Sequence, residues 1–238
     1  MRVQLQIAEI EIDVLYKRVR NVHLSVYPPS GSVRMTVPER TDIETVRAYA
    51  ISRLDWIRRQ QSELRAQQRE TARDYRDRES HYLWGTRRLL KLVERPGSPE
   101  VTATPRRIHL SIHPGSGTKR RAEVLEKFFR DQIREAAAPL FATWEPKIGV
   151  RHERLFVQRM KTRWGSCTPS TASIRLNTDL AKKPPECLEY ILVHELIHLI
   201  EPTHNERFRR LMNEHLPDWS RRREVLNRLP VRHEDWGY

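Results

Sequence analysis

The spacing of three histidines near the C-terminal end constrains this chain more than any other feature. His194, Glu195 and His198 are followed by Pro202 and His204. His194 and His198 are four residues apart, so on a helix they project from one face and can share a metal ion. Pro202 ends a helix and lets the chain turn His204 back toward that face. The segment therefore predicts a helix, a break and a third metal ligand.

This set of donor groups predicts a catalytic zinc site. Three imidazoles and one water form an open tetrahedral site, and zinc lowers the pKa of its bound water from about 15.7 to roughly 7. Glu195 is placed to accept the proton of that water and to pass it to a leaving amine. We therefore expect one zinc ion per chain on His194, His198 and His204, with Glu195 as general base, and hydrolysis of peptide bonds in a protein or peptide substrate.

The third ligand has an alternative. A carboxylate on the next helix could replace the third imidazole, and Glu214 and Asp218 both lie within reach along the chain. We favour His204 because Pro202 gives it a short route and imidazole suits zinc. A ligand histidine usually donates its second ring N–H to a carboxylate or a carbonyl. Glu201 and Asp218 are both candidates for that acceptor.

Composition limits the class of protein. Of 238 residues, 38% are hydrophobic and 32% are charged, which is enough for a solvated protein with a sizeable core. No apolar run approaches the 18–20 residues of a membrane span, and the first residues lack the apolar region of a signal peptide. Cys167 and Cys187 are too few for a disulfide framework. These features predict a cytoplasmic protein without a membrane partner.

The net charge of +13 is the second notable bulk property. A basic surface attracts nucleic acid, so binding of nucleic acid is one interpretation. Acidic residues are interspersed through most of the chain, which favours the simpler interpretation of an arginine-rich composition with a solvated surface. Charge alone therefore assigns no function.

The N-terminal region of about 1–150 is predicted to be β-rich and helical. Apolar residues alternate over about 3–37, with a turn at 28–32, and this pattern is typical of strands. The other predicted elements are a helix over about 41–77, strands at 82–93 and 106–112, and a helix over about 118–142 that Pro139 should end or kink. No internal repeat is evident.

The second region, 151–238, carries the predicted site. Short strands are expected at 155–157 and 173–178, and Pro184-Pro185 opens the helix that bears the first two histidines. Further helices are expected over 204–215 and from Asp218. The alternation of short strands and helices predicts an α+β fold in which the two regions form one composite domain.

Several motifs together resemble one family. They are Lys161-Thr162-Arg163-Trp164-Gly165-Ser166-Cys167, Ile174-x-Leu176-Asn177, Pro185, His194-Glu195-x-x-His198 and His204-Asn205-x-x-Phe208. This series closely resembles the YgjP-like zinc metallopeptidases, which are zincins related to the SprT-like and WLM groups. The resemblance implies a zincin-like core with helices packed on a small sheet, the three histidines as zinc ligands and Glu195 as base. It covers most of the chain and is weak over 65–120.

The segment before the predicted site has two interpretations. Gly165 could permit a tight turn with Trp164 packed under the helix, which is a structural role. Alternatively Trp164, Gly165, Ser166 and Asn177 line the substrate cleft, with 173–177 as an edge strand that pairs with an extended peptide. Cys167 could bind the metal, but three histidines already suffice.

Three functions are compatible with the sequence. The first is a zinc peptidase, and the second is a protease that acts on DNA-bound proteins. The third is a non-enzymatic binding module stabilised by zinc. Glu195 argues against the third, because a structural zinc site needs no base and usually has four protein ligands.

Overall fold

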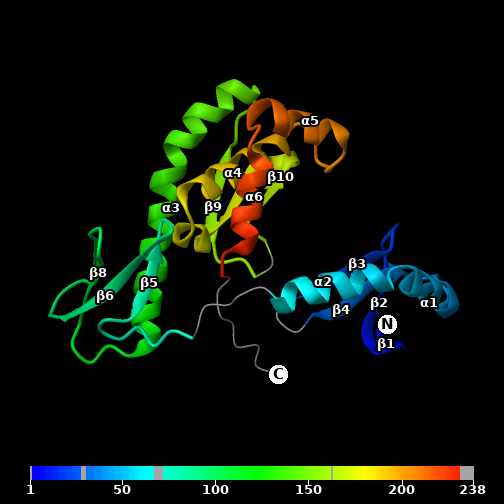
Figure 1. The fold of residues 1–238 in the computed structure, drawn as a ribbon, viewed down its shortest axis with the longest axis horizontal. Helices are drawn as coiled ribbons and strands as arrows, with labels where there is room; N and C mark the ends of the chain where they lie inside the picture. Colours follow the sequence, from blue (N-terminus) through cyan, green and yellow to red (C-terminus); the bar gives the residue numbers. More distant parts are fainter. Residues whose placement is uncertain (1, 28–30, 67–71, 162, 231–238) are drawn as a thin grey trace. The chain divides into compact units, whose positions relative to one another are not determined.

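The computed structural model describes residues 2–27, 31–66, 72–161 and 163–230, and it contains two compact units (Figure 1). The N-terminal unit lies within the first 70 residues, and the C-terminal unit covers 71–229. Each unit has its own cluster of buried apolar residues. The sequence placed a boundary at residue 150 within one composite domain, and the structure divides the chain near residue 70 instead. The physical reason is that Leu110, Ile133 and Leu192 belong to one core.

The N-terminal unit begins with a four-stranded sheet. Its strands are β1 (Arg2–Ile7), β2 (Ile10–Lys17), β3 (His23–Tyr27) and β4 (Ser32–Pro38), in the spatial order β1-β2-β4-β3. Strands β2 and β4 run parallel, and the two outer pairs are antiparallel. Alternate residues such as Ile12, Val14 and Met35 are buried, as the period of a strand with one covered face requires. The strands expected over about 3–37 are therefore present. Residues 28–30 of the turn expected at 28–32 lie outside the described residues.

The helix expected over 41–77 is two helices, α1 (Ile43–Ser52) and α2 (Leu54–Ala66). Asp42 caps α1, since its carboxylate accepts a hydrogen bond of 2.8 Å from the Thr45 backbone N–H. After the second helix, the described residues from 72 to 79 are not helical. The Glu79 carboxylate accepts bonds from the backbone N–H groups of Asp74 and Arg76, which favours a turn over a helix.

The C-terminal unit opens with a second four-stranded sheet. Its strands are β5 (Ser80–Leu83), β6 (Thr86–Glu94), β7 (Glu100–Ala103) and β8 (Arg107–Ile112), in the order β5-β6-β8-β7. Strands β6 and β8 are parallel, and the outer pairs are antiparallel. This is the same order and the same set of directions as in the N-terminal unit, and in both units a helix follows the last strand. The structure therefore contains a repeated topology that the sequence did not reveal.

Helix α3 (Thr118–Ile148) runs through two prolines, Pro139 and Pro146. The sequence predicted that this helix ends near residue 142, and this boundary is wrong because the helix continues to Ile148. Its buried residues recur every three or four positions on both sides of the prolines: Leu125, Phe129, Ile133, Ala137, Phe141, Trp144 and Ile148. Continuous packing of this stripe outweighs the lost hydrogen bonds. The helix ends at Gly149, whose φ of 76° lies in the left-handed region that favours glycine.

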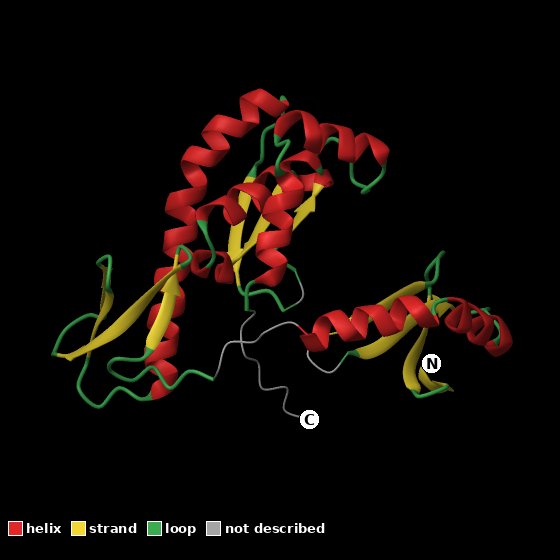
Figure 2. Ribbon diagram, viewed as in Figure 1, coloured by secondary structure: helices red, strands yellow, loops and turns green. Residues whose placement is uncertain are grey.

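A small three-stranded sheet and three helices complete the C-terminal unit (Figure 2). The strands are β9 (Arg154–Gln158), β10 (Gly165–Thr168) and β11 (Ser173–Asn177), in the order β10-β11-β9. The helices are α4 (Pro185–Ile197), α5 (Glu206–His215) and α6 (Trp219–Arg228). Strand β11 is therefore the central strand and β10 is an edge strand. The prediction that 173–177 forms the edge is wrong, because Ser173–Asn177 pairs with a neighbour on both sides.

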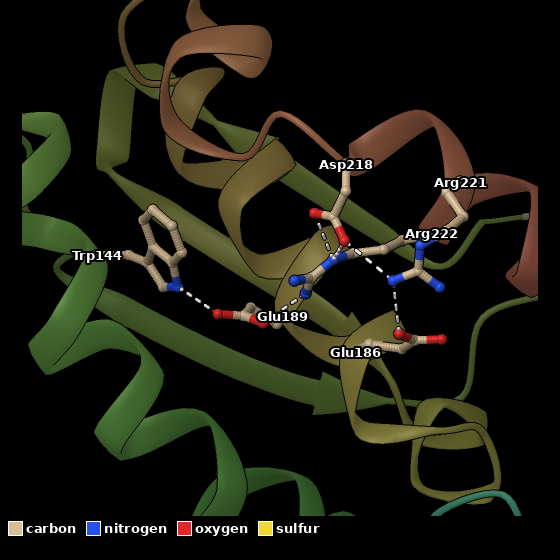
Figure 3. Close-up of polar contacts among 6 residues, drawn as sticks. All are labelled: Trp144, Glu186, Glu189, Asp218, Arg221 and Arg222. Carbon is tan, nitrogen blue, oxygen red and sulfur yellow. Dashed lines mark hydrogen bonds and ion pairs between the residues drawn. The ribbon is translucent and has the colours of Figure 1, made fainter.

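Polar side chains bind α6 to α4 (Figure 3). Arg222 contacts Glu189 at 2.5 Å and Asp218 at 2.9 Å, and its side chain is 15% exposed. Arg221 bridges Glu186 and Asp218, each at 3.0 Å. Glu189 also accepts a bond of 3.0 Å from the indole N–H of Trp144 in α3. This network joins three helices, and each of its charged groups except Glu186 has two partners within it.

The α+β class with helices packed on small sheets is confirmed. Helices α3 and α4 contribute to one apolar core together with strands β5 to β9 and β11. Within the described ranges, none of the helices combines the length and the apolar character that crossing a membrane requires.

We expect Arg222→Ala to lower the free energy of unfolding by about 2–3 kcal/mol, because it leaves Glu189 half-buried without its cation. Urea denaturation measures this change. Arg228→Ala is the matched control on the same helix. Arg228 pairs with Glu224, and their side chains are 76% and 60% exposed, respectively. Loss of this ion pair should therefore cost less than about 0.5 kcal/mol. Equal costs for the two variants would contradict the role of the network.

Candidate metal centre and active-site cleft

Helix α4 carries two of the histidines in an apolar setting. Pro185 begins the helix, where a missing backbone N–H is harmless. Leu192, Val193, Leu196 and Ile197 are completely buried around the polar residues. The C-terminal half of the helix therefore lies inside the core, whereas Glu186 and Glu189 in its first half reach α6.

The turn after α4 returns the chain to the same point. His198 caps the end of the helix, and its ring Nδ1–H donates a bond of 3.0 Å to the Glu201 carbonyl. The Glu201 carboxylate accepts bonds from Thr203, at 3.2 Å from the backbone N–H and 2.8 Å from the hydroxyl. The next helix starts at once, with Asn205 as its cap. This compact turn sets His204 beside the helix.

The three imidazoles meet through their Nε2 atoms. His194 Nε2 lies 3.1 Å from His198 Nε2 and 3.0 Å from His204 Nε2, and the last two atoms are 3.0 Å apart. Two nitrogens bound to one tetrahedral zinc at about 2.0–2.1 Å would be roughly 3.3 Å apart, so the cluster fits such an ion. Among the described residues, the grouping that could hold a metal consists of these three histidines and includes neither Glu214 nor Asp218.

The orientation and protonation of the rings also suit metal binding. A carbonyl only accepts hydrogen bonds, so the bond to Glu201 leaves His198 Nε2 with its lone pair free when the ring is neutral. Burial lowers the pKa of His194 to about 3, with smaller contributions from His198, His204 and Arg223, so its ring is neutral. Of the two candidate acceptors, Glu201 binds His198 through its backbone carbonyl, and Asp218 binds arginines instead.

Phe208 packs against all three imidazoles. Its ring centroid lies 4.9 Å from that of His194, 4.7 Å from that of His198 and 4.8 Å from that of His204, and the side chain is buried. Aromatic contacts of this kind restrict the tilt of a ring. The sequence motif contained Phe208, but only the structure gives the residue this role.

Glu195 lies on the buried side of the cluster and is 4% exposed. Burial raises the pKa of its carboxyl to about 8, and the charge of Arg163 acts in the opposite direction. A cation bound at the histidines would favour the ionised form. Glu195 is thus a buried acid near the three imidazoles, which is the environment that tunes a carboxylate for proton transfer.

Gly165 touches this carboxylate. A Cβ atom at position 165 would lie 2.6 Å from Glu195 Oε1, 2.9 Å from Glu195 Cγ and 2.8 Å from Ile191 Cγ2. These distances are far shorter than van der Waals contact, so only glycine leaves room for the carboxylate. The earlier expectation of a tight turn is replaced by close packing, because Gly165 lies in strand β10.

A cavity of about 640 Å³ opens onto these groups. Strand β10 and its approach form one side, and Trp164, Gly165 and Ser166 line it as the sequence suggested. Helix α6 forms another side through residues that the sequence analysis missed: Arg223, Leu226 and Asn227. Their spacing of three and four positions marks one helix face, which is a weak signal without the fold.

Two other predicted residues have different positions. Asn177 is buried and is not among the residues that line the cavity. Its side chain donates bonds of 2.8 Å to the carbonyls of Met160 and Arg163, so it holds the loop that precedes β10. Cys167 lines the cavity but is absent from the histidine group, and burial raises its pKa to about 11. A neutral thiol is a poor metal ligand.

Comparison with known proteins found one matching family and similar solved structures. The sequence profile of the YgjP-like metallopeptidase domain matches residues 20–229. Among solved structures, the metallopeptidase zymogen abylysin of Pyrococcus abyssi is 24% identical, with 38% of this chain and 88% of that chain covered and a TM-score of 0.34. The zymogen jannalysin of Methanocaldococcus jannaschii is 19% identical, with 40% and 92% covered and a TM-score of 0.33. No curated protein matches significantly.

A cluster of histidines beside a buried glutamate, at the bottom of an open cleft, defines the class of protein as a metallopeptidase. The chain belongs to the YgjP-like metallopeptidase family. The family resemblance noted in the sequence is therefore confirmed.

We expect Gly165→Ala to lower the free energy of unfolding by about 2–3 kcal/mol, because the new methyl group overpacks the site. Gly117→Ala is the control, since a Cβ there meets nothing within 4 Å and should cost less than about 1 kcal/mol. The cost of Gly165→Ala should fall by at least half in a Glu195→Ala background, as urea denaturation of the double-mutant cycle would measure. An unchanged cost would show that the new methyl group does not clash with the Glu195 side chain.

Proposed function

We propose that this metallopeptidase is zinc-dependent, with His194, His198 and His204 as the ligands and Glu195 as the general base. The convergence of three Nε2 atoms within 3.0–3.1 Å of one another, beside a buried carboxylate, carries this proposal. Three neutral imidazoles are the donor set of open catalytic zinc sites. The proposal assumes one ion per chain.

Zinc bound there lowers the pKa of a water molecule and polarises the carbonyl of the scissile bond. Glu195 accepts a proton from the attacking water, and it then delivers this proton to the leaving amine. Gly165 keeps the carboxylate in place, because the glycine lets it approach the strand more closely than any side chain would allow. The Glu201 carbonyl and Phe208 orient the ligand rings.

Strand β10 is the proposed binding edge for the substrate backbone. It pairs with β11 on one side, and no described strand pairs with its other side. It also lines the cavity that opens onto the histidines. An extended peptide could add to this edge through main-chain hydrogen bonds and present a bond to Glu195. Trp164, Gly165 and Ser166 are then substrate-binding residues, and Asn177 supports the loop behind them.

The central test compares wild type with Glu195→Gln in cleavage of casein. The variant should retain one zinc per chain and lose at least about 100-fold in rate, because the amide cannot accept the proton. Glu214→Gln, an exposed substitution outside the cavity, is the matched control and should cleave at the wild-type rate. Equal zinc content with equal cleavage by Glu195→Gln would refute the mechanism.

Removal of the metal tests the ligand set. Treatment with a chelator should abolish cleavage, and added zinc should restore it. His204→Ala should lower zinc affinity at least tenfold and reduce the rise in thermal midpoint that zinc causes, whereas Glu214→Gln should alter neither. Zinc content by mass spectrometry and thermal melts provide the readouts. Retention of zinc by His204→Ala with its loss from Glu214→Gln would favour the carboxylate alternative.

A structural zinc site is a poor explanation, because Glu195 and an open cleft would then have no purpose. No feature of the described residues favours action on DNA-bound proteins, so this function stays a prediction from the sequence. The cytoplasmic location also stays a prediction.

A further inference from the structure

Two arginines line the cleft from different elements. Arg163 precedes strand β10, and Arg223 lies on α6. Both side chains are exposed. Neither guanidinium forms an ion pair or a hydrogen bond with any described residue, although the chain forms many arginine–carboxylate pairs elsewhere, as at Arg222. The cleft thus contains two cations whose charge is not matched by a bonded carboxylate.

The backbones that carry these cations are fixed. Asn177 donates a bond of 2.8 Å to the Arg163 carbonyl, and its own backbone N–H binds the Trp164 carbonyl at 2.9 Å. On α6, Arg221 and Arg222 are bound to the acids of α4 and to Asp218 (Figure 3). Because successive helix residues point in directions about 100° apart, this binding leaves Arg223 on the face that borders the cleft. The network therefore orients Arg223 as well as stabilising the helix.

The charged residues that line the cleft give it a net positive charge. Glu195 supplies the one carboxylate among the described lining residues, against the two arginines. Both cations lower the pKa of groups at the bottom of the cleft: Arg163 acts on Glu195, and Arg223 acts on His194 and His204. A bound zinc would add two further positive charges. A substrate that carries a carboxylate complements this cleft, and a cationic one is repelled.

We propose that Arg163 and Arg223 are specificity-determining residues that bind a carboxylate of the peptide substrate near the bond that is cut. This inference deepens the proposed peptidase function and rests on it. Guanidinium groups bind carboxylates through two parallel N–H donors, so they also orient the peptide. The carboxylate belongs either to an acidic side chain or to the C-terminus of the substrate, since both present the same group.

Binding to zinc-loaded Glu195→Gln protein tests the inference without cleavage. The probes are fluorescent decapeptides in three sets: neutral peptides with an amidated C-terminus, the same peptides with one Glu walked through every position, and neutral peptides with a free C-terminal carboxylate. Fluorescence anisotropy should show at least one carboxylate peptide binding about tenfold more tightly than its neutral counterpart, and less so in 0.5 M salt. The second and third sets tell the two sources of carboxylate apart.

Variants assign the preference to the arginines. Arg163→Gln/Arg223→Gln, made in the same Glu195→Gln background, should bind carboxylate and neutral peptides within about twofold of each other. Arg223→Lys should retain part of the preference, since it keeps the charge. Arg228→Gln is the matched control on the same helix and should retain all of it, because Arg228 pairs with Glu224 and does not line the cleft. Circular dichroism checks that each variant is folded.

The outcomes separate this inference from the proposed function. Equal binding of all peptides by the Glu195→Gln protein, or a preference that survives the double arginine substitution, overturns the inference. Should zinc-loaded wild type then still cleave the peptides, the peptidase function stands without it. Should an arginine-dependent preference be found while zinc-loaded wild type cleaves none of the peptides, carboxylate binding by the two arginines stands and the peptidase function fails.

Discussion

The burial of the C-terminal half of α4 is the constraint on which the site depends. Leu192, Val193, Leu196 and Ile197 are completely buried there, and the polar side chains of His194 and Glu195 lie at the cleft. The same burial has opposite effects on the two kinds of group, since it raises the pKa of Glu195 and lowers that of His194. One physical cause therefore favours the uncharged form of both neighbouring residues.

The rest of the site is made by elements that close around this helix. The turn after His198 is short because Glu201 binds residues on both sides of it. Its carbonyl accepts a bond from the His198 ring, and its carboxylate accepts one from the Thr203 hydroxyl. Helix α6 forms part of the cleft because charged side chains join it to α4 over a surface that apolar contacts alone do not cover. Within three consecutive arginines of α6, two therefore stabilise the fold, and the third is left for the cleft.

The remaining architecture follows from packing of sheets and long helices. The two four-stranded sheets share one order of strands, and in each a helix follows the last strand. The second of these sheets and α3 share a core with the site, so the boundary between the units falls near residue 70. Helix α3 continues through Pro139 because its buried stripe continues, which shows that local breaking signals yield to a well-packed face.

The sequence by itself determined what depends on residues close together along the chain. The spacing of His194 and His198, the break at Pro202 and the return of His204 are local, and they sufficed to indicate a metal-binding histidine cluster with Glu195 beside it. Short motifs between Lys161 and Phe208 indicated the family. The strands up to residue 37 and the α+β class followed equally from local patterns.

Tertiary structure alone decided how distant segments meet. It set β11 in the centre of its sheet, used Asn177 to hold a loop, pressed Gly165 against Glu195 and turned Arg223 toward the cleft. Each of these results depends on contacts between residues many positions apart. Such contacts are chosen by the packing of the whole core, and no local pattern records that choice.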